Sequence, residues 1–233
     1  MWAGLAVLGS VGFINWIATR SEDRGVHWPL RRGEDATDNL MEEFFASYKL
    51  APEFPVSQIA SPARINPSPG TPDDPVPDDY KLTITDMGGN SHTLTLDQLK
   101  AMPSKTMVTQ FCCIEGWSQI VQWTGVPLSE LLIALKFVDL AKMDQAPKYV
   151  RMETAQGTYY VGWDLASALH PQTLLVYAMN GAPLEPEHGA PIRLYSPVKY
   201  GYKNIKWLTT IILTNDFPTD YWGDQGYDWY GGL

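Results

Sequence analysis

The stretch Gln110-Phe111-Cys112-Cys113-Ile114-Glu115-Gly116-Trp117-Ser118 is the part of this sequence from which the fold and the chemistry can be argued. Residues 106–113 are rich in β-formers and predict a strand that ends at the two cysteines. Neighbouring side chains of a strand point to opposite faces, so one cysteine can pack while the other faces a pocket. A thiolate is a ligand for soft transition metals. The segment therefore offers one metal ligand at the end of a strand.

These two cysteines are the only ones among 233 residues. Adjacent cysteines rarely meet disulfide geometry, so the sequence holds no disulfide framework, and cysteine usage does not reveal the compartment. One thiolate is too few for a structural zinc site. The histidines show no metal-ligand spacing: His27, His92, His170 and His188. The other ligands of a metal at this place are therefore expected from a cofactor.

A second informative region lies about 75 residues downstream, at residues 188–193 and 199–206. It is cationic, punctuated by glycine and interleaved with aromatic residues, which suits an anionic group such as a phosphate. The chain as a whole is acidic, with a net charge of −9, so nucleic-acid binding is a poor fit. A local cluster of positive charge in an acidic chain indicates a site for a small anion. A solvated Lys/Arg face is the alternative.

The two regions together resemble the sulfite-oxidase superfamily of molybdopterin proteins, and within it the bacterial methionine-sulfoxide-reducing branch. Residues 113–118 are similar to that branch's Cys-Val-Glu-x-Trp-Ser string. Residues 189–194 are similar to its Gly-Ala-Pro-x-Arg-Leu string, and residues 199–206 to its Lys-Tyr-Gly-x-Lys-x-Ile-Lys string. Residues 149–154 and 169–174 also look like family segments, and the resemblance covers roughly residues 80–233.

The resemblance implies a molybdenum–molybdopterin cofactor without an added nucleotide. It implies that Cys113 is the protein ligand of the metal, with Cys112 packed behind it. Glu115 follows as a catalytic candidate that either tunes the centre and relays protons or caps a turn. The positions that resemble the family's cofactor contacts are Asn66, Thr154, His188, Arg193, Asn204, Ile205 and Lys206. Among the lysines, Lys206 is favoured for cofactor contact over Lys199 and Lys203.

Two positions depart from the family pattern. His188 stands where the sulfoxide-reducing relative has asparagine, although either side chain can donate a hydrogen bond. Gln110 stands where sulfite oxidation needs an arginine, which leaves the substrate open.

Residues 1–19 carry no charged side chain and are just long enough to cross a bilayer. Trp2 and Trp16 lie near the two ends, as interfacial anchors do. The segment lacks the basic start and the cleavage site of a secretory signal, so we expect a retained transmembrane helix. A buried core helix is the alternative.

The orientation of this anchor is open. Four arginines follow it: Arg20, Arg24, Arg31 and Arg32. The positive-inside rule would place that side in the cytoplasm, whereas the resemblance implies an extracytoplasmic, periplasmic catalytic domain.

The chain divides into a membrane anchor (1–19), a polar helix with a proline-rich wrap or linker (20–79), and a molybdopterin-binding domain (80–233). Apolar spacing predicts an amphipathic helix over residues 38–49. Residues 51–79 hold eight of the eighteen prolines, which excludes a helix or a central strand. Strands are expected at residues 81–86, 92–96, 106–113, 149–153, 158–163, 192–195 and 207–214. With short helices expected at 96–102 and 127–136, the pattern indicates a mixed α+β domain, which is also the class of the sulfite-oxidase fold.

The resulting hypothesis is a membrane-anchored molybdopterin oxidoreductase that transfers an oxygen atom or electrons at a Cys-ligated molybdenum. The sequence has no haem or flavin motif, so electrons are expected from a separate cytochrome or membrane redox partner. One alternative is an accessory subunit of a membrane complex that keeps the fold with or without the cofactor. Another is a cysteine-dependent hydrolase, although no histidine lies near Cys113 in the sequence.

Overall fold

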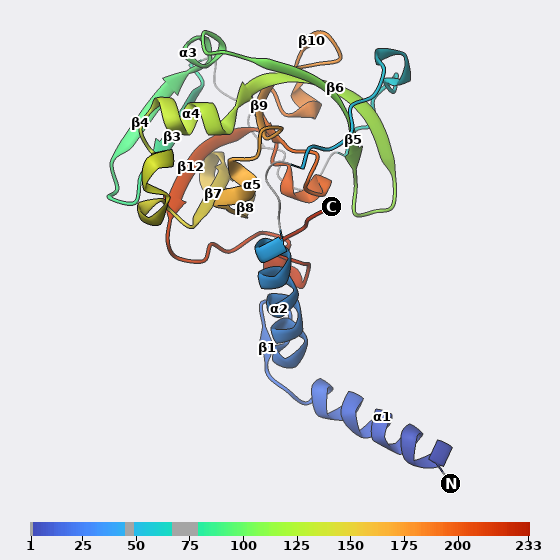
Figure 1. Ribbon diagram of the computed structural model, residues 1–233. Coiled ribbons are helices and arrows are strands. Elements are labelled where there is room, and N and C mark those ends of the chain that lie inside the picture. Colours follow the sequence, from blue (N-terminus) through green and yellow to red (C-terminus); the bar gives the residue numbers. More distant parts are fainter. Residues whose placement is uncertain (1, 45–48, 67–78) are drawn as a thin grey trace.

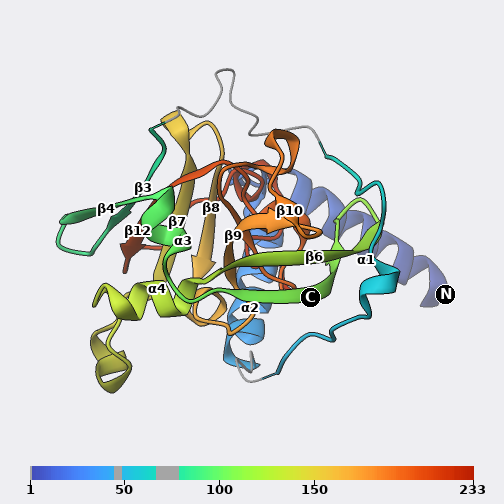
Figure 2. The ribbon, with the colours of Figure 1, turned by 90° about the horizontal axis from the view of Figure 1, so that it is seen from above.

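The computed structural model describes residues 2–44, 49–66 and 79–233. Residues 81–214 form two larger sheets with short helices between their strands. One sheet has the strand order β10-β9-β6-β5, with β11 also pairing with β9. Its strands are β5 (Lys105–Cys112), β6 (Ser118–Pro127), β9 (Leu174–Met179), β10 (Ala182–Pro183) and β11 (Arg193–Tyr195). All of these pairings are antiparallel. Figure 2 shows β5 and β6 as a long hairpin at one side of the molecule.

The other sheet has the order β4-β3-β12-β7-β8. Its strands are β3 (Lys81–Thr85), β4 (Ser91–Thr95), β7 (Tyr149–Thr154), β8 (Tyr160–Asp164) and β12 (Leu208–Thr214). The predicted hairpins β3–β4 and β7–β8 are confirmed, and β12 joins them by pairing parallel to β3 and antiparallel to β7. The helices of this part are α3 (Leu96–Lys100), α4 (Leu128–Ala134) and α5 (Leu165–Ala168). The mixed α+β class follows from this arrangement.

The main core lies on one face of this second sheet. Side chains in β7 alternate between buried and half-buried, as a strand with one covered face requires. Leu128, Leu131 and Leu132 of α4 pack into the same core. A smaller core, which contains Trp123 and Tyr195, lies against β5, β6 and β9. The two rings stack at 4.4 Å between centroids, close to where β5 ends at the cysteines.

The proline-rich segment is extended where the structure describes it, apart from one 3₁₀ turn at Val56–Gln58. Residues 49–66, here called the strap, run along the β5–β6 hairpin, and Figure 2 shows them passing along it. Phe54 N donates to Val108 O and Ala60 N donates to Ile120 O, both at 2.9 Å. Residues 49–66 thus lie against the hairpin, while Pro67, Pro69, Pro72, Pro75 and Pro77 lie outside the described residues, and the assignment of the whole segment as a wrap or linker stays a prediction.

The amphipathic helix begins earlier than the sequence predicts. Helix α2 spans Trp28–Phe44 rather than 38–49, and residues 45–48 lie outside the described residues. The early turns were missed because Pro29 and Gly33 interrupt the helical pattern, although proline is tolerated in a first turn. A two-stranded ribbon of β1 (Glu22–Asp23) and β2 (Val26–His27) precedes the helix.

Helix α1 (Trp2–Ala18) extends away from the two-sheet body, with α2 between them (Figure 1). Among the residues that the structure describes, no helix combines the length and the apolar character needed to cross a bilayer. The membrane anchor is therefore not confirmed and stays a prediction, as do the three domain boundaries.

Candidate functional site

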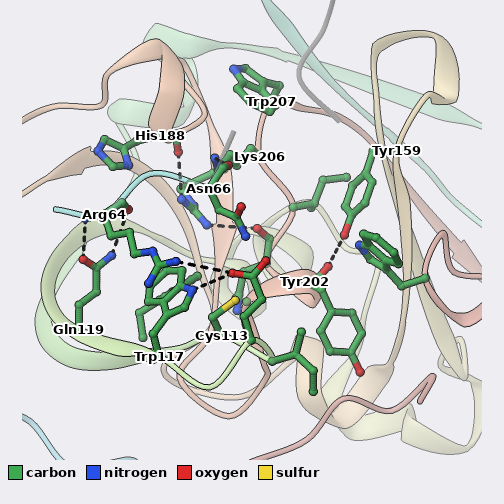
Figure 3. Close-up of a pocket in the computed structure, with 18 of the residues that line it drawn as sticks. Arg64, Asn66, Cys113, Trp117, Gln119, Tyr159, His188, Tyr202, Lys206 and Trp207 are labelled. Carbon is green, nitrogen blue, oxygen red and sulfur yellow. Dashed lines mark hydrogen bonds and ion pairs between the residues drawn. The ribbon is translucent and has the colours of Figure 1, made fainter. Parts of the chain in front are cut away.

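A single cavity gathers almost all of the predicted site residues. It contains about 1000 Å³ of empty space, its open mouth included. Eight of the nine candidates line it: Asn66, Cys113, Glu115, His188, Arg193, Asn204, Ile205 and Lys206. Figure 3 shows the Cys113 thiol, Arg64 and Lys206 on different walls of this cavity.

One wall is the turn after β5. Cys113 N donates to Trp117 O at 2.9 Å, and Gly116 N donates to Cys113 O at 3.1 Å. This tight turn places Cys113 in the cavity lining, whereas Cys112 is not part of the lining. Burial is the main cause that raises the pKa of the Cys113 thiol. An activated nucleophile needs a lowered pKa, so the burial that raises the pKa of this thiol does not favour the cysteine hydrolase.

Glu115 is held in position above the same turn. Its Oε2 accepts a hydrogen bond from Trp117 Nε1 at 2.9 Å and lies 3.9 Å from the guanidinium of Arg64. Arg64 in turn stacks on the Trp117 ring, 4.4 Å from the centroid. The carboxylate therefore has a fixed donor and a nearby cation beside Cys113, which is a suitable arrangement for holding or passing a proton.

The strap supplies Arg64 and Asn66 to the cavity. Arg64 N donates to Gln119 Oε1 at 2.8 Å, which ties the strap to β6. Asn66 O accepts from Lys206 Nζ at 2.6 Å, which ties it to the opposite wall. Sequence reasoning missed Arg64. Its position two residues before Asn66 was the only signal that could have identified it.

The opposite wall carries unpaired positive charge. The buried Arg193 guanidinium donates to the carbonyls of His188 at 3.0 Å and Asn204 at 3.2 Å. Lys206 Nζ donates to Glu187 O at 2.8 Å as well as to Asn66 O. Within the described residues neither cation has a carboxylate at ion-pair distance. Arg193 is buried, where a charge is normally paired, and Lys206 is half-buried. This wall therefore carries two positive side chains that no carboxylate of the described residues neutralises, and a bound anion could do so.

The pKa values of the basic side chains on this wall are lowered, as expected where positive charges are buried close together without an anion. Burial lowers the pKa of Arg193 to about 10. Burial, together with the nearby Arg193 charge, lowers the pKa of Lys206 to about 7. The pKa of His188 is lowered by burial and by both cations. A bound phosphate would reverse each of these effects, so the donor set fits the phosphate end of a pterin cofactor.

Gly189 allows the two halves of this wall to meet. Its φ is +103°, and a Cβ at this position would lie 2.7 Å from Lys206 Cβ. Only glycine fits such an approach. The Asn204 side chain is used within the fold, since its Oδ1 accepts from Ser196 N and its Nδ2 donates to the carbonyls of Lys199 and Tyr200.

Thr154 is the one candidate outside the lining. Its buried hydroxyl accepts from Tyr159 N at 3.0 Å and bonds Thr158 at 3.0 Å. It lies directly behind Tyr159, which does line the cavity. A cofactor contact from Thr154 therefore stays a prediction.

The cavity lining also contains apolar and aromatic side chains that were not among the predicted site residues. They are Phe111, Ile114, Tyr159, Met179, Tyr202, Trp207, Trp222 and Tyr227. They come from distant parts of the sequence, so no local pattern could have grouped them.

Lys199 and Lys203 are neither a solvated edge nor part of the cavity lining. Lys203 Nζ lies 2.5 Å from Asp220 Oδ2, and Lys199 Nζ lies 3.3 Å from Asp164 Oδ2. All four side chains are buried. These two lysines stabilise the fold under the C-terminal loop, here defined as residues 220–230.

Lys203→Met is expected to lower the free energy of unfolding by about 3–5 kcal/mol, because it leaves Asp220 buried without its partner. Lys206→Met is the matched control, since Lys206 bonds only carbonyls, and its loss is expected to be about 1 kcal/mol. Urea unfolding of both variants without cofactor measures the difference. Equal losses would contradict this assignment of roles.

The cation wall also predicts a pH-dependent affinity for anions. Sulfate stays a dianion between pH 7 and 9, while Lys206, with its pKa of about 7, loses its proton over this range. Sulfate binding to cofactor-free protein is therefore expected to weaken as pH rises, by at most about tenfold per pH unit for one linked proton. Titration calorimetry measures it, and Lys206→Met is expected to flatten the dependence. A flat profile in the unmodified chain would refute the role of Lys206.

Comparison with known proteins gives four findings. Residues 69–222 match the family model described as oxidoreductase molybdopterin binding domain. The chain is 39% identical over 192 residues to the putative protein-methionine-sulfoxide reductase subunit YedZ1 of Azospira oryzae, which covers 81% of this chain and 70% of that relative. It is 37% identical over 149 residues to the protein-methionine-sulfoxide reductase catalytic subunit MsrP of Xanthomonas axonopodis, covering 60% of this chain and 46% of the relative. The sulfane dehydrogenase SoxCD of Paracoccus pantotrophus superposes with a TM-score of 0.52 at 23% identity, over 60% of this chain and 39% of that one.

Proposed function

The chain belongs to the family of oxidoreductase molybdopterin-binding domains, and from this membership we propose that it reduces the sulfoxide of oxidised methionine side chains. The expected sulfite-oxidase-type fold is confirmed, and the family implies a molybdenum–molybdopterin cofactor. The chain spans 70% of the YedZ1 relative but under half the length of MsrP, so the activity, substrate and partners of those proteins enter here as proposals.

The observation that carries the proposal is the pairing of a lone thiol and an anion-deficient cation wall across one cavity. Cys113 would ligate the metal, while Arg193 and Lys206 would hold the phosphate of the pterin. When bound, this group supplies exchange of an oxygen atom and two electrons with the substrate. Reduction of a sulfoxide to a thioether consumes two electrons and two protons and releases water.

The chain's own residues serve the rest of the reaction. Glu115, held by Trp117 and near Arg64, lines the cavity beside Cys113 and is placed to deliver a proton there. The aromatic side chains that line the cavity suit a methionine side chain, since sulfur makes favourable contacts with aromatic rings. Gln110 donates to Ser118 and does not line the cavity, so this position lacks the arginine that sulfite oxidation needs, and it also departs from the sulfoxide-reducing relatives.

The test is reduction of a methionine sulfoxide peptide by chain loaded with molybdenum and pterin, using reduced viologen dye as the electron donor. We expect about one molybdenum per chain and turnover to the methionine peptide, with sulfite left unoxidised. Absence of molybdenum in carefully prepared protein would favour the accessory subunit instead.

We also propose that residues 1–19 anchor the chain to a membrane and place the catalytic domain outside the cytoplasm, where a separate cytochrome or membrane redox partner supplies electrons. The support is the uncharged α1 with its exposed Val11, Phe13 and Ile14. Cell fractionation tests it with the full chain and with a chain lacking residues 1–19. Equal distribution of the two would refute the anchor.

A further inference from the structure

A buried arginine joins the N-terminal arm, here defined as residues 20–44, to the C-terminal loop. The Arg31 side chain on α2 is only 1% exposed. Its Nη2 donates to Gly223 O at 2.9 Å and its Nη1 to Tyr227 O at 3.3 Å. The same guanidinium donates to Arg24 O at 2.5 Å within the arm and ion-pairs with Glu34 at 2.7 Å. One side chain therefore bonds both segments at once.

The backbones of the arm and the loop also meet closely. Gly25 has a φ of +80°, and a Cβ there would lie 2.8 Å from the carbonyl carbon of Gln225. From the other side, a Cβ on Gly226 would lie 2.9 Å from Val26 Cγ1. This tight packing means that the loop cannot shift without moving the arm. Figure 1 shows α2 directly below the body, where the C-terminal chain passes.

The loop that Arg31 holds forms one wall of the functional cavity. Trp222 and Tyr227 both line it, and their rings lie 4.9 Å apart. Tyr227 N donates to Trp222 O at 3.0 Å, so the backbone of the turn joins the two residues whose rings are in contact. The carbonyls that Arg31 bonds, those of Gly223 and Tyr227, belong to the same turn.

We propose that Arg31 is a positioning residue that fixes the Trp222–Tyr227 wall and so sets the fit of the cavity to its substrate. The arm lies outside residues 69–222, so the family match gives it no role. The guanidinium is suited to the task because its planar fork reaches carbonyls of both segments, which a point charge cannot do. The arm is thereby a structural part of the site, and whatever binds the arm acts on the wall.

Arg31→Gln is the variant that tests this, with Arg32→Gln as the matched control. Arg32 is the next residue of α2, carries the same charge and is exposed. Hydrogen exchange of the full chain is followed in two sets of peptides, those covering residues 20–44 and those covering 220–230. We expect Arg31→Gln to raise exchange at least about tenfold in both sets, and Arg32→Gln to change neither.

Kinetics give a second readout, which rests on the proposed function. For a methionine sulfoxide peptide, Arg31→Gln is expected to raise KM about tenfold and to leave kcat within about twofold, because it loosens a binding wall and not the reacting groups. Hydrogen exchange can be measured whether or not the chain reduces sulfoxides. A chain that fails to reduce sulfoxides at all refutes the proposed function, while the exchange data still decide the role of Arg31.

The outcome that overturns the inference is increased exchange in residues 20–44 alone, with KM unchanged. The loop would then be held by its other contacts, such as Asp220 Oδ1, which accepts from Trp222 N and Gly223 N at 3.1 Å. If Arg31→Gln does not fold, Arg31→Lys answers the same question, because it keeps the charge but loses the fork. It is expected to show the same pattern with smaller changes.

Discussion

Replacing Cys113 by serine is expected to lower sulfoxide turnover on the order of a thousandfold or more, while the pterin remains in the protein. The thiol faces the cavity from the turn after β5, and burial keeps its pKa high until a cation replaces the proton. Serine replaces a soft, easily deprotonated sulfur donor with a hard oxygen donor that rarely loses its proton, so the electronic properties of the metal would change. Turnover and pterin content, measured on the same preparation, separate loss of the ligand from loss of the cofactor.

Cys112→Ser is the matched control for that experiment. Cys112 is adjacent in the sequence, half-buried and absent from the cavity lining. We expect this variant to retain turnover within a few-fold. If Cys112→Ser lost turnover and Cys113→Ser kept it, the wrong sulfur would have been assigned.

Arg193→Met is expected to lower the pterin and molybdenum content per chain by about tenfold or more. A charge-assisted hydrogen bond to an anion contributes about 1.5–3 kcal/mol, and Arg193 has no carboxylate partner among the described residues to share its charge. Loss of these hydrogen bonds should therefore lower the amount of cofactor that stays bound to the chain. Content is measured by metal analysis and by fluorescence of the released, oxidised pterin.

The control for this variant is Arg151→Met. Arg151 ion-pairs with Glu153 at 2.5 Å and stacks on Tyr160 on β8, outside the cavity lining. Its removal should leave pterin content unchanged. Full cofactor content in Arg193→Met would mean that the phosphate is held elsewhere.

Local patterns in the sequence were enough for part of the fold. The hairpin β3–β4 was predictable because alternating residues flank Gly88 and Gly89, and α4 because Pro127 precedes a leucine face. The strands β6 and β9 were missed. Most residues of β9 are buried, so it lacks the alternation that marks a half-buried strand. In β6, Gln119 and Gln122 point to opposite faces of the strand, so polar side chains interrupt the apolar pattern on both faces.

The candidate site was predictable to the extent that its chemistry lies in contiguous motifs. Cys113, Arg193 and Lys206 fall in such motifs and meet in one cavity. Arg64 and Trp222 could not be grouped with them, because the strap and the C-terminal loop reach the cavity only through long-range pairing. The solvated-edge alternative for Lys199 and Lys203 was wrong for the same reason, since their partners Asp164 and Asp220 lie 35 and 17 residues away.

X-ray absorption at the molybdenum edge tests the central claim most directly, because it counts the sulfur atoms around the metal. Comparison of the unchanged chain with Cys113→Ser is expected to show the loss of one sulfur scatterer, with the sulfur donors of the pterin unchanged and Cys112→Ser identical to the unchanged chain. An identical sulfur count in Cys113→Ser and the unchanged chain would contradict the assignment of Cys113 as the protein ligand.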